Sequence, residues 1–181
     1  MKTNCHGLLF FLLLPFLLSC TGCVQNRPSV TARDAVQSLD TGRFTGKWYE
    51  VAQYGRPERK KMAAVTISGT VDQKEIIHLV QNAHKFTPYG PEKSIRGKAK
   101  QKKDHPGVFR AAFFLNFYRD YYVLYVEEDY SCTVICNDAA SRLWILSRHP
   151  SLPATSVIRV RETMQAVGFD PGQLQWAESY F

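Results

Sequence analysis

Gly-Lys-Trp-Tyr-Glu-Val-Ala, residues 46–52, is the stretch around which the chain is organised. Side chains alternate along a strand, which predicts one face with Trp48, Glu50 and Ala52 and another with Tyr49, Val51 and Gln53. Gly46 allows a sharp turn into this strand. A Trp at the start of a strand is best used as a plug at one end of a core, where its area is buried and its indole N–H finds a partner. We therefore expect residues 46–52 to open a small β-barrel, with Trp48 in a structural role.

Seven further short runs of strand-forming residues follow, and each ends in turn residues. They cover residues 64–72, 76–84, 95–102, 108–114, 121–127, 130–137 and 143–147. This even spacing is typical of an all-β barrel or sandwich, and the short connections favour an eight-stranded antiparallel up-and-down barrel. We predict a single domain of this kind, residues 40–181, because no linker or shift in composition divides it.

The pattern changes to helical spacing at residues 154–167. Val157, Val160, Met164 and Val167 recur every three or four positions, and Gly168 follows as a stop. We expect this C-terminal α-helix to pack its apolar side on the outside of the barrel; contact with a membrane is the alternative. A short extended piece, residues 173–177, then returns to the sheet.

Strand alternation predicts a barrel interior lined by large apolar side chains. The inward candidates are Val65, Ile67, Ile77, Leu79, Phe114, Tyr121, Val123, Tyr125, Trp144 and Leu146. Residues 95–102 carry small residues on their inner face, among them Gly97 and Ala99. An eight-stranded barrel is either filled by its side chains or holds one small ligand. Small residues opposite aromatic ones favour a ligand cavity, and a closed core is the alternative.

The N-terminus has the features of an export signal. Residues 8–18 form an apolar run too short to span a bilayer, and Leu-Leu-Ser-Cys at residues 17–20 resembles a bacterial lipobox. We expect residues 1–19 to be a lipoprotein-type signal peptide, Cys20 to be acylated, and residues 20–39 to form a lipidated polar tether. Cys23 is the alternative acylation site, and an ordinary signal peptide with incidental cysteines is also open. Thr21, rather than Asp, after Cys20 points to the bacterial outer membrane by the sorting rule for such lipoproteins.

Two other cysteines do not predict a disulfide. Cys132 and Cys136 are four positions apart in a strand-like run, about 13 Å at ~3.3 Å per residue, which exceeds the ~7 Å limit for a bridge. We expect two free, half-buried thiols. A redox or nucleophilic cysteine is the alternative, although no His lies near either one in the sequence.

The net charge of +7 is modest, but the cations are clustered. One group lies in the first long loop and consists of Arg56, Arg59, Lys60 and Lys61; the other consists of Lys98, Lys100, Lys102 and Lys103. These are either solvated surfaces or places where anionic lipid headgroups or a phosphate bind. We expect no nucleic-acid partner, because a periplasm-facing lipoprotein does not meet nucleic acid.

Three segments together resemble the signature regions of the lipocalin family. They are residues 46–52, Phe-Tyr-Arg-Asp-Tyr-Tyr-Val-Leu at residues 117–124, and Leu-Trp-Ile-Leu-Ser-Arg-His-Pro at residues 143–150. The likeness is closest to bacterial outer-membrane lipoprotein lipocalins of the Blc type and to apolipoprotein D, and it covers about residues 40–178. The family's usual Thr-Asp-Tyr turn is replaced by Val126, Glu127 and Glu128, which weakens any inference about receptor contacts there.

The resemblance implies roles for particular residues. Arg148 would pack across the indole of Trp48 and close one end of the barrel, a cation–π contact of roughly 2 kcal/mol. Tyr121 and Trp144 would line the pocket, and Gln81 would orient a headgroup. With the inward faces above, the expected ligand-binding residues are Ile67, Leu79, Gln81, Phe114, Tyr121, Val123, Tyr125, Trp144 and Leu146, and the headgroup candidates at the mouth are Arg56, Arg59, Lys60 and Lys61.

These features predict a lipid carrier. We expect it to be anchored to the outer membrane and to carry or store a fatty acid, a lysophospholipid or a similar ligand in envelope maintenance, held by ~0.8 kcal/mol per buried CH₂. A non-catalytic adaptor for a protein partner is one alternative. A lipid-modifying enzyme is the other, and we do not expect it, because the chain has no Gly-x-Ser-x-Gly, His-Glu-x-x-His or Gly-rich phosphate motif. No cofactor or metal is predicted, and the choice between monomer and homodimer stays open.

Overall fold

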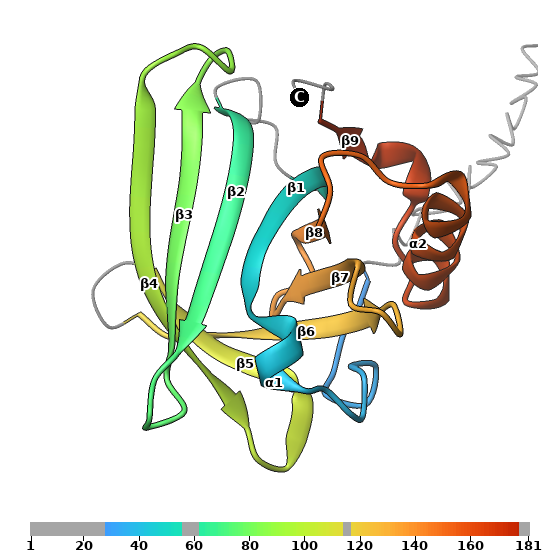
Figure 1. Ribbon diagram of the computed structural model, residues 1–181. Helices are drawn as coiled ribbons and strands as arrows, with labels where there is room; N and C mark the ends of the chain where they lie inside the picture. Colours follow the sequence, from blue (N-terminus) through green and yellow to red (C-terminus); the bar gives the residue numbers. More distant parts are fainter. Residues whose placement is uncertain (1–27, 56–61, 114–116, 178–181) are drawn as a thin grey trace, which may run out of the picture.

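The computed structural model describes residues 28–55, 62–113 and 117–177, which form a β-barrel with a helix against its outside (Figure 1). The elements in chain order are α1 (Thr41–Phe44), β1 (Gly46–Tyr54), β2 (Met62–Val71), β3 (Ile77–Lys85), β4 (Glu92–Lys102), β5 (His105–Ala112), β6 (Arg119–Val126), β7 (Cys132–Asn137), β8 (Leu143–Ser147), α2 (Ala154–Ala166), η2 (Pro171–Gln173) and β9 (Gln175–Trp176). The predicted eight-stranded barrel with one C-terminal α-helix is thus confirmed.

The strands follow each other in an antiparallel, up-and-down order, and β1 closes the sheet by pairing with both β8 and β2. The pairing of β1 with β2 covers only its first residues, from Gly46 opposite Gly69 to Tyr49 opposite Thr66. Beyond that point β9 takes over this edge of β1, with Gln53 opposite Gln175. In Figure 1 the ribbons of β1 and β2 separate upward from the place where their pairing ends.

A register shift in β1 corrects the predicted alternation of its faces. The pairing with β8 passes from Glu50 to Ala52, so one residue of β1 has no opposite partner. Val51 and Ala52 consequently both pack on the outside of the barrel, and Gln53 lines the inside. The expectation that Ala52 shares a face with Trp48 was wrong, because an extra residue in a strand reverses the alternation beyond it.

A second register shift lies in β6, between Val123 and Tyr125 in their pairing with β7. Val123 remains on the inner side, whereas Tyr125 packs against the outer hydrophobic cluster and interacts with Arg159 of α2. The prediction that Tyr125 faces the interior was therefore wrong. The cause is again the extra residue, Leu124, which also faces outward.

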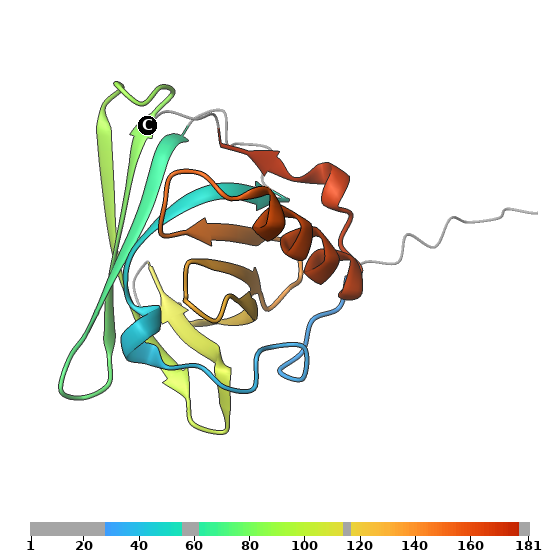
Figure 2. The ribbon, with the colours of Figure 1, turned by 45° about the vertical axis from the view of Figure 1, so that its right-hand side comes forward.

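Two hydrophobic clusters stabilise the fold. The outer core lies between the barrel wall and α2 and holds Ala52, Leu143, Ile145, Val160 and Met164, each completely buried. Figure 2 shows α2 lying against the outside of the barrel, as its apolar spacing predicted. The inner cluster lies within the barrel and holds, among others, Leu39, Ile77, Phe109 and Val123.

Residues 28–39 pack on the barrel and are not a free tether. Val30 belongs to the outer core and Leu39 to the inner cluster, and the backbone N–H of Val36 donates to the carbonyl of Val123 at 2.8 Å. The segment passes so closely over β5 that a Cβ on Gly107 would lie 2.3 Å from the carbonyl oxygen of Val36. Residues 28–39 are therefore part of the folded domain, whereas Cys20 and Cys23 lie outside the described residues.

None of the helices within residues 28–55, 62–113 and 117–177 has the length and apolar character to cross a bilayer.

Candidate functional site

A cavity of about 300 Å³ occupies the barrel interior. Its volume lies at the lower end of the range for small-molecule sites in proteins. It is lined by side chains or backbone of Phe44, Thr45, Gly46, Trp48, Ile67, Gly69, Ile77, Leu79, Gln81, Ala99, Phe109, Ala111, Phe113, Tyr121, Ile135, Arg142, Trp144 and Leu146. The lining is almost wholly apolar, so the cavity is suited to a hydrocarbon chain rather than to a polar metabolite.

Trp48 and α1 form the closed end of this cavity. The indole of Trp48 is 4% exposed and donates its N–H to the carbonyl of Phe44 at 2.8 Å, and the Phe44 ring stacks on Phe109 at a centroid distance of 5.4 Å. Each of these contacts requires the chain to enter β1 directly from α1. The predicted plug at one end of the barrel is thus present.

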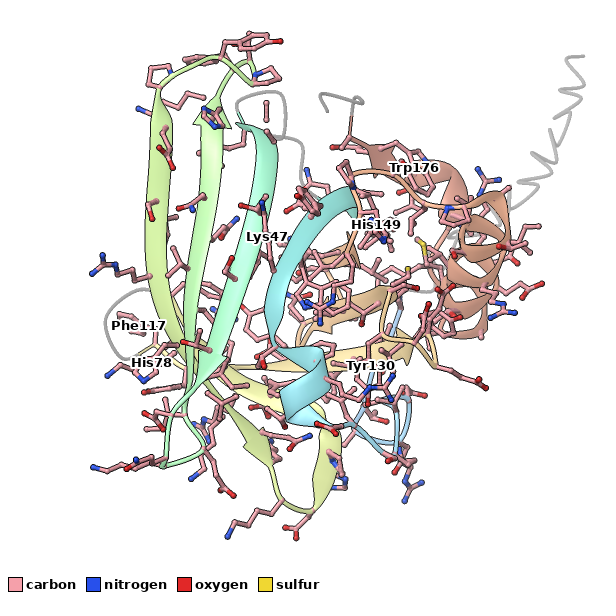
Figure 3. The ribbon with its side chains drawn as sticks, in the orientation of Figure 1. Lys47, His78, Phe117, Tyr130, His149 and Trp176 are labelled. Carbon is pink, nitrogen blue, oxygen red and sulfur yellow. The ribbon has the colours of Figure 1, made fainter. Side chains whose placement is uncertain are left out.

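Arg148 fixes the closed end from outside. Its guanidinium carbon lies 3.7 Å from the centre of the Trp48 ring, which confirms the predicted contact. The same group donates to the carbonyls of Arg43, Thr45 and Lys47 at 2.7, 2.8 and 2.9 Å. A hydrogen bond from Nε also reaches the carbonyl of Tyr130, which Figure 3 shows beside α1. One side chain thus holds α1, β1 and the β6–β7 turn together.

Tyr121 and Trp144 form an aromatic pair on the cavity wall. Their ring centroids are 5.9 Å apart and the planes are tilted by 45°. Burial, followed by the negative charge of Asp138, raises the pKa of Tyr121 above its ordinary value, so its phenol is protonated at neutral pH. The phenol O–H is available to donate a hydrogen bond to a ligand.

Arg142 is a cavity residue that the sequence reasoning missed. It lies just before β8, in the turn that follows β7, and lines the cavity together with Trp144. Its charge acts on the Tyr121 phenol, which indicates that the two side chains approach each other. Its position in a short turn after Ser141 resembles that of an ordinary solvated arginine, and nothing in the sequence distinguishes it.

The sequence predicted part of the cavity lining. Six expected residues line it: Ile67, Leu79, Gln81, Tyr121, Trp144 and Leu146. Val123 faces inward within the inner cluster and lies outside this lining, and Tyr125 lies on the outer side of the wall. The remaining expected residues, Phe114 and the headgroup candidates Arg56, Arg59, Lys60 and Lys61, lie outside the described residues.

Aromatic side chains that were not expected add to the wall. Phe44 lines the cavity from α1, Phe109 from β5, and Phe113 from the position directly after β5. Phe109 and Phe113 belong to a run that the sequence identified as a strand, but the tight register with Ala99 and Gly97 of β4 decides which of its residues face inward. That register could not be predicted from the run Val-Phe-Arg-Ala-Ala-Phe-Phe, because apart from Arg110 its residues are apolar and do not alternate with polar ones.

Cys132 and Cys136 are free, and they are buried completely rather than by half. Both belong to the outer core, away from the cavity lining. Burial raises the pKa of each thiol to about 12, so the nucleophilic thiolate is scarce at neutral pH. Within the described ranges, no group of three His, Cys, Asp or Glu side chains is arranged to hold a metal ion.

The second cationic group lies on the outer face of β4. Lys98 and Lys100 are exposed, and Lys102 forms an ion pair with Asp120. This face lies opposite to Ala99, which lines the cavity. The cluster therefore belongs to the barrel surface and not to the site.

Comparisons with known proteins agree with this geometry. A family model described as a lipocalin-like domain matches residues 39–179. The outer membrane lipoprotein Blc of Vibrio cholerae serotype O1 is 27% identical over 169 residues, which cover 90% of this chain and 96% of that protein. Its counterpart from Escherichia coli K12 is 24% identical over 152 residues, covering 79% and 81%. Among solved structures, lobster apocrustacyanin A1 matches with a TM-score of 0.67 and 16% identity, over 83% of this chain and 87% of that one.

Proposed function

The chain belongs to the lipocalin family, and on this premise we propose that it carries or stores a fatty acid, a lysophospholipid or a similar single-chain amphiphile. The observation that carries the proposal is the apolar cavity of about 300 Å³ with a cation among its lining residues. Its place of action in this proposal is the bacterial outer membrane, where it would serve envelope maintenance.

The chemistry of the cavity supports this class of ligand. Transfer of an acyl chain from water to an apolar lining contributes ~0.8 kcal/mol per CH₂. Among the described residues that line the cavity, Arg142 is the only one with a charged side chain. A carboxylate or phosphate at the head of the ligand is attracted to this guanidinium, while the tail extends toward Trp48.

A membrane location is supported by the relatives and by the N-terminal sequence. The Blc proteins of Vibrio cholerae and Escherichia coli are named outer membrane lipoproteins. In this chain the lipobox-like run at residues 17–20 precedes the first residue packed on the barrel by about ten positions. Mass spectrometry of the protein extracted from membranes tests the anchor: we expect acyl chains on Cys20, with Cys23 as the alternative, and an unmodified N-terminus would contradict it.

Binding is tested with the fluorescence of Trp144. The chain is produced with Cys20→Ser and Cys23→Ser, so that no anchor is added, and is delipidated before titration with a lysophospholipid of one acyl chain. We expect a saturable change in emission at micromolar lipid, because the tail would replace water beside the Tyr121–Trp144 pair. Native mass spectrometry of protein that was not delipidated should show a co-purifying lipid.

Trp144→Phe is the matched control for that titration. It keeps an aromatic ring on the wall and removes one of the two tryptophans that line the cavity, so the fluorescence change should shrink to the part that Trp48 contributes, while lipid remains detectable by mass spectrometry. Absence of any lipid signal in both measurements would contradict the carrier and favour an adaptor function. The apolar side of α2 gives the adaptor little support, because Val160 and Met164 are buried against the barrel.

Catalysis is not part of this proposal. The described lining of the cavity contains no Ser, Cys, His, Asp or Glu side chain, which are the usual nucleophiles and bases. The two thiols lie in the outer core with raised pKa values. Turnover of a lysophospholipid by the purified protein, lost on substitution of Cys132 or Cys136, would overturn this view.

A further inference from the structure

A second chamber lies in the barrel wall where β1 leaves β2. Its volume is about 70 Å³, and its lining is more polar than that of the main cavity, with a carboxylate, an ammonium group and two amides. It is lined by Glu50, Gln53, Met62, Val65, Gln81, Ala83, Lys93 and Ile95, which come from β1, β2, β3 and β4. The register shift after Glu50 creates this lining, because it turns Gln53 inward in place of Ala52.

The side chain of Gln53 indicates that the chamber is a binding site. Its side chain is only 1% exposed, and neither Nε2 nor Oε1 has a hydrogen-bond partner within the described chain. A buried amide without partners destabilises a protein, and an apolar side chain of similar shape avoids that cost. The Gln53 amide therefore needs a hydrogen-bond partner that the described part of the chain does not supply.

The chamber adjoins the main cavity. Gln81 lines both of them, and Gln53 lies directly opposite Trp144 in the pairing of β1 with β8. A ligand whose tail lies beside Trp144 can therefore place its head against Gln53. A volume of 70 Å³ has room for about two water molecules at ~30 Å³ each, or for the few heavy atoms of a small polar head.

We propose that this chamber binds the hydroxyl groups of the ligand's head, as in the glycerol of a monoacylglycerol; the inference rests on the carrier function proposed above. A glutamine amide offers both donors and an acceptor, and a hydroxyl group is likewise both donor and acceptor. A phosphate or carboxylate matches only the donors, and the charges of Glu50 and of the exposed Lys93 in the chamber lining have opposite signs, so together they give an anion no clear net attraction. Anionic groups are therefore directed to Arg142, and uncharged hydroxyl groups to Gln53.

Two ligands with the same tail test the proposal. Monopalmitoylglycerol and methyl palmitate share the acyl chain, and only the former has free hydroxyl groups. The protein without its two N-terminal acylation sites should bind monopalmitoylglycerol about tenfold more tightly, which corresponds to one or two net hydrogen bonds. In Gln53→Met, which keeps length and loses both polar atoms, this preference should vanish while the affinity for methyl palmitate is retained.

The possible results distinguish a failure of the carrier function from a failure of the chamber proposal. If neither ligand binds and the lysophospholipid does not bind either, the carrier function fails and the chamber proposal fails with it; if only the lysophospholipid binds, the carrier stands and the chamber proposal fails. If both bind with equal affinity, or if Gln53→Met keeps the preference, the carrier stands and the chamber holds only water. As a measurement that needs no variant, the side-chain amide NMR signal of Gln53 should shift with monopalmitoylglycerol and stay in place with methyl palmitate; equal shifts would overturn the proposal.

Discussion

The two sides of the barrel wall are packed very differently. On the outside, Ala52, Leu143, Val160 and Met164 are completely buried in the outer core. On the inside, Leu79, Tyr121 and Trp144 border a cavity of about 300 Å³ and are only partly buried. Close packing supplies dispersion contacts that an empty space does not. The completely buried outer core can therefore stabilise the fold while the interior keeps space for a ligand.

The largest expected effect on stability comes from truncating a leucine to alanine, compared on the two sides of the wall. Leu143→Ala should lower the free energy of unfolding by about 2–5 kcal/mol, because it leaves a void in a filled core. Leu79→Ala should cost roughly 1 kcal/mol, because that side chain already borders empty space. Urea unfolding followed by circular dichroism measures both. Equal losses would mean that the two sides are packed alike.

The reverse change sharpens the contrast. Ala52→Phe should destabilise the protein by about 1–3 kcal/mol or more, since the outer core has no room for a ring. Ala111→Phe points its ring into the cavity and should change stability by under about 1 kcal/mol. It should nevertheless reduce lysophospholipid affinity at least tenfold by filling the binding space, as measured by the Trp144 titration. An Ala111→Phe protein that binds normally would contradict the assignment of the cavity.

Smaller effects come from the two thiols of the outer core. Their folded-state pKa is about 12, whereas unfolded cysteine titrates near 9, so above about pH 9 the unfolded state loses protons that the folded state keeps. Stability is therefore lost as pH rises from about 9 toward 12, by roughly 1 kcal/mol per thiol at pH 10. Cys132→Ala and Cys136→Ala should each flatten the dependence of unfolding free energy on pH. Unchanged slopes would indicate that the thiols are hydrated.

The smallest effect is expected at Arg142. Replacing it with Gln removes an exposed charge whose interactions water screens, so the affinity for a fatty acid should fall only about threefold. The affinity for a methyl ester of the same chain should stay constant, and so should the unfolding midpoint. The difference between acid and ester should shrink as salt is added. Equal losses for acid and ester would assign Arg142 a packing role instead.

The fold and part of the site could be predicted from the sequence, for identifiable reasons. Trp48 and Arg148 stand in long motifs, and regular turns delimit each strand, so the barrel and its closed end could be predicted. The faces of β1 and β6 beyond their register shifts could not, because a run such as Tyr-Val-Leu-Tyr-Val is apolar on both sides. The packing of residues 28–39 on the barrel could not be predicted either. Here the apolar signal is too weak, because Val30 and Leu39 are isolated among polar residues.

The contacts of Arg148 also set an order of events in folding. Its guanidinium binds the carbonyls of Arg43 and Lys47, which lie 105 and 101 positions earlier in the chain. Contacts between such distant positions carry a high loop-closure entropy and slow the folding of β-proteins. At a synthesis rate of about 5–20 residues per second, Arg148 is made roughly 5–20 s after the carbonyl groups that it binds. The contacts of Arg148 at the closed end of the barrel therefore cannot form until most of the chain has been synthesised.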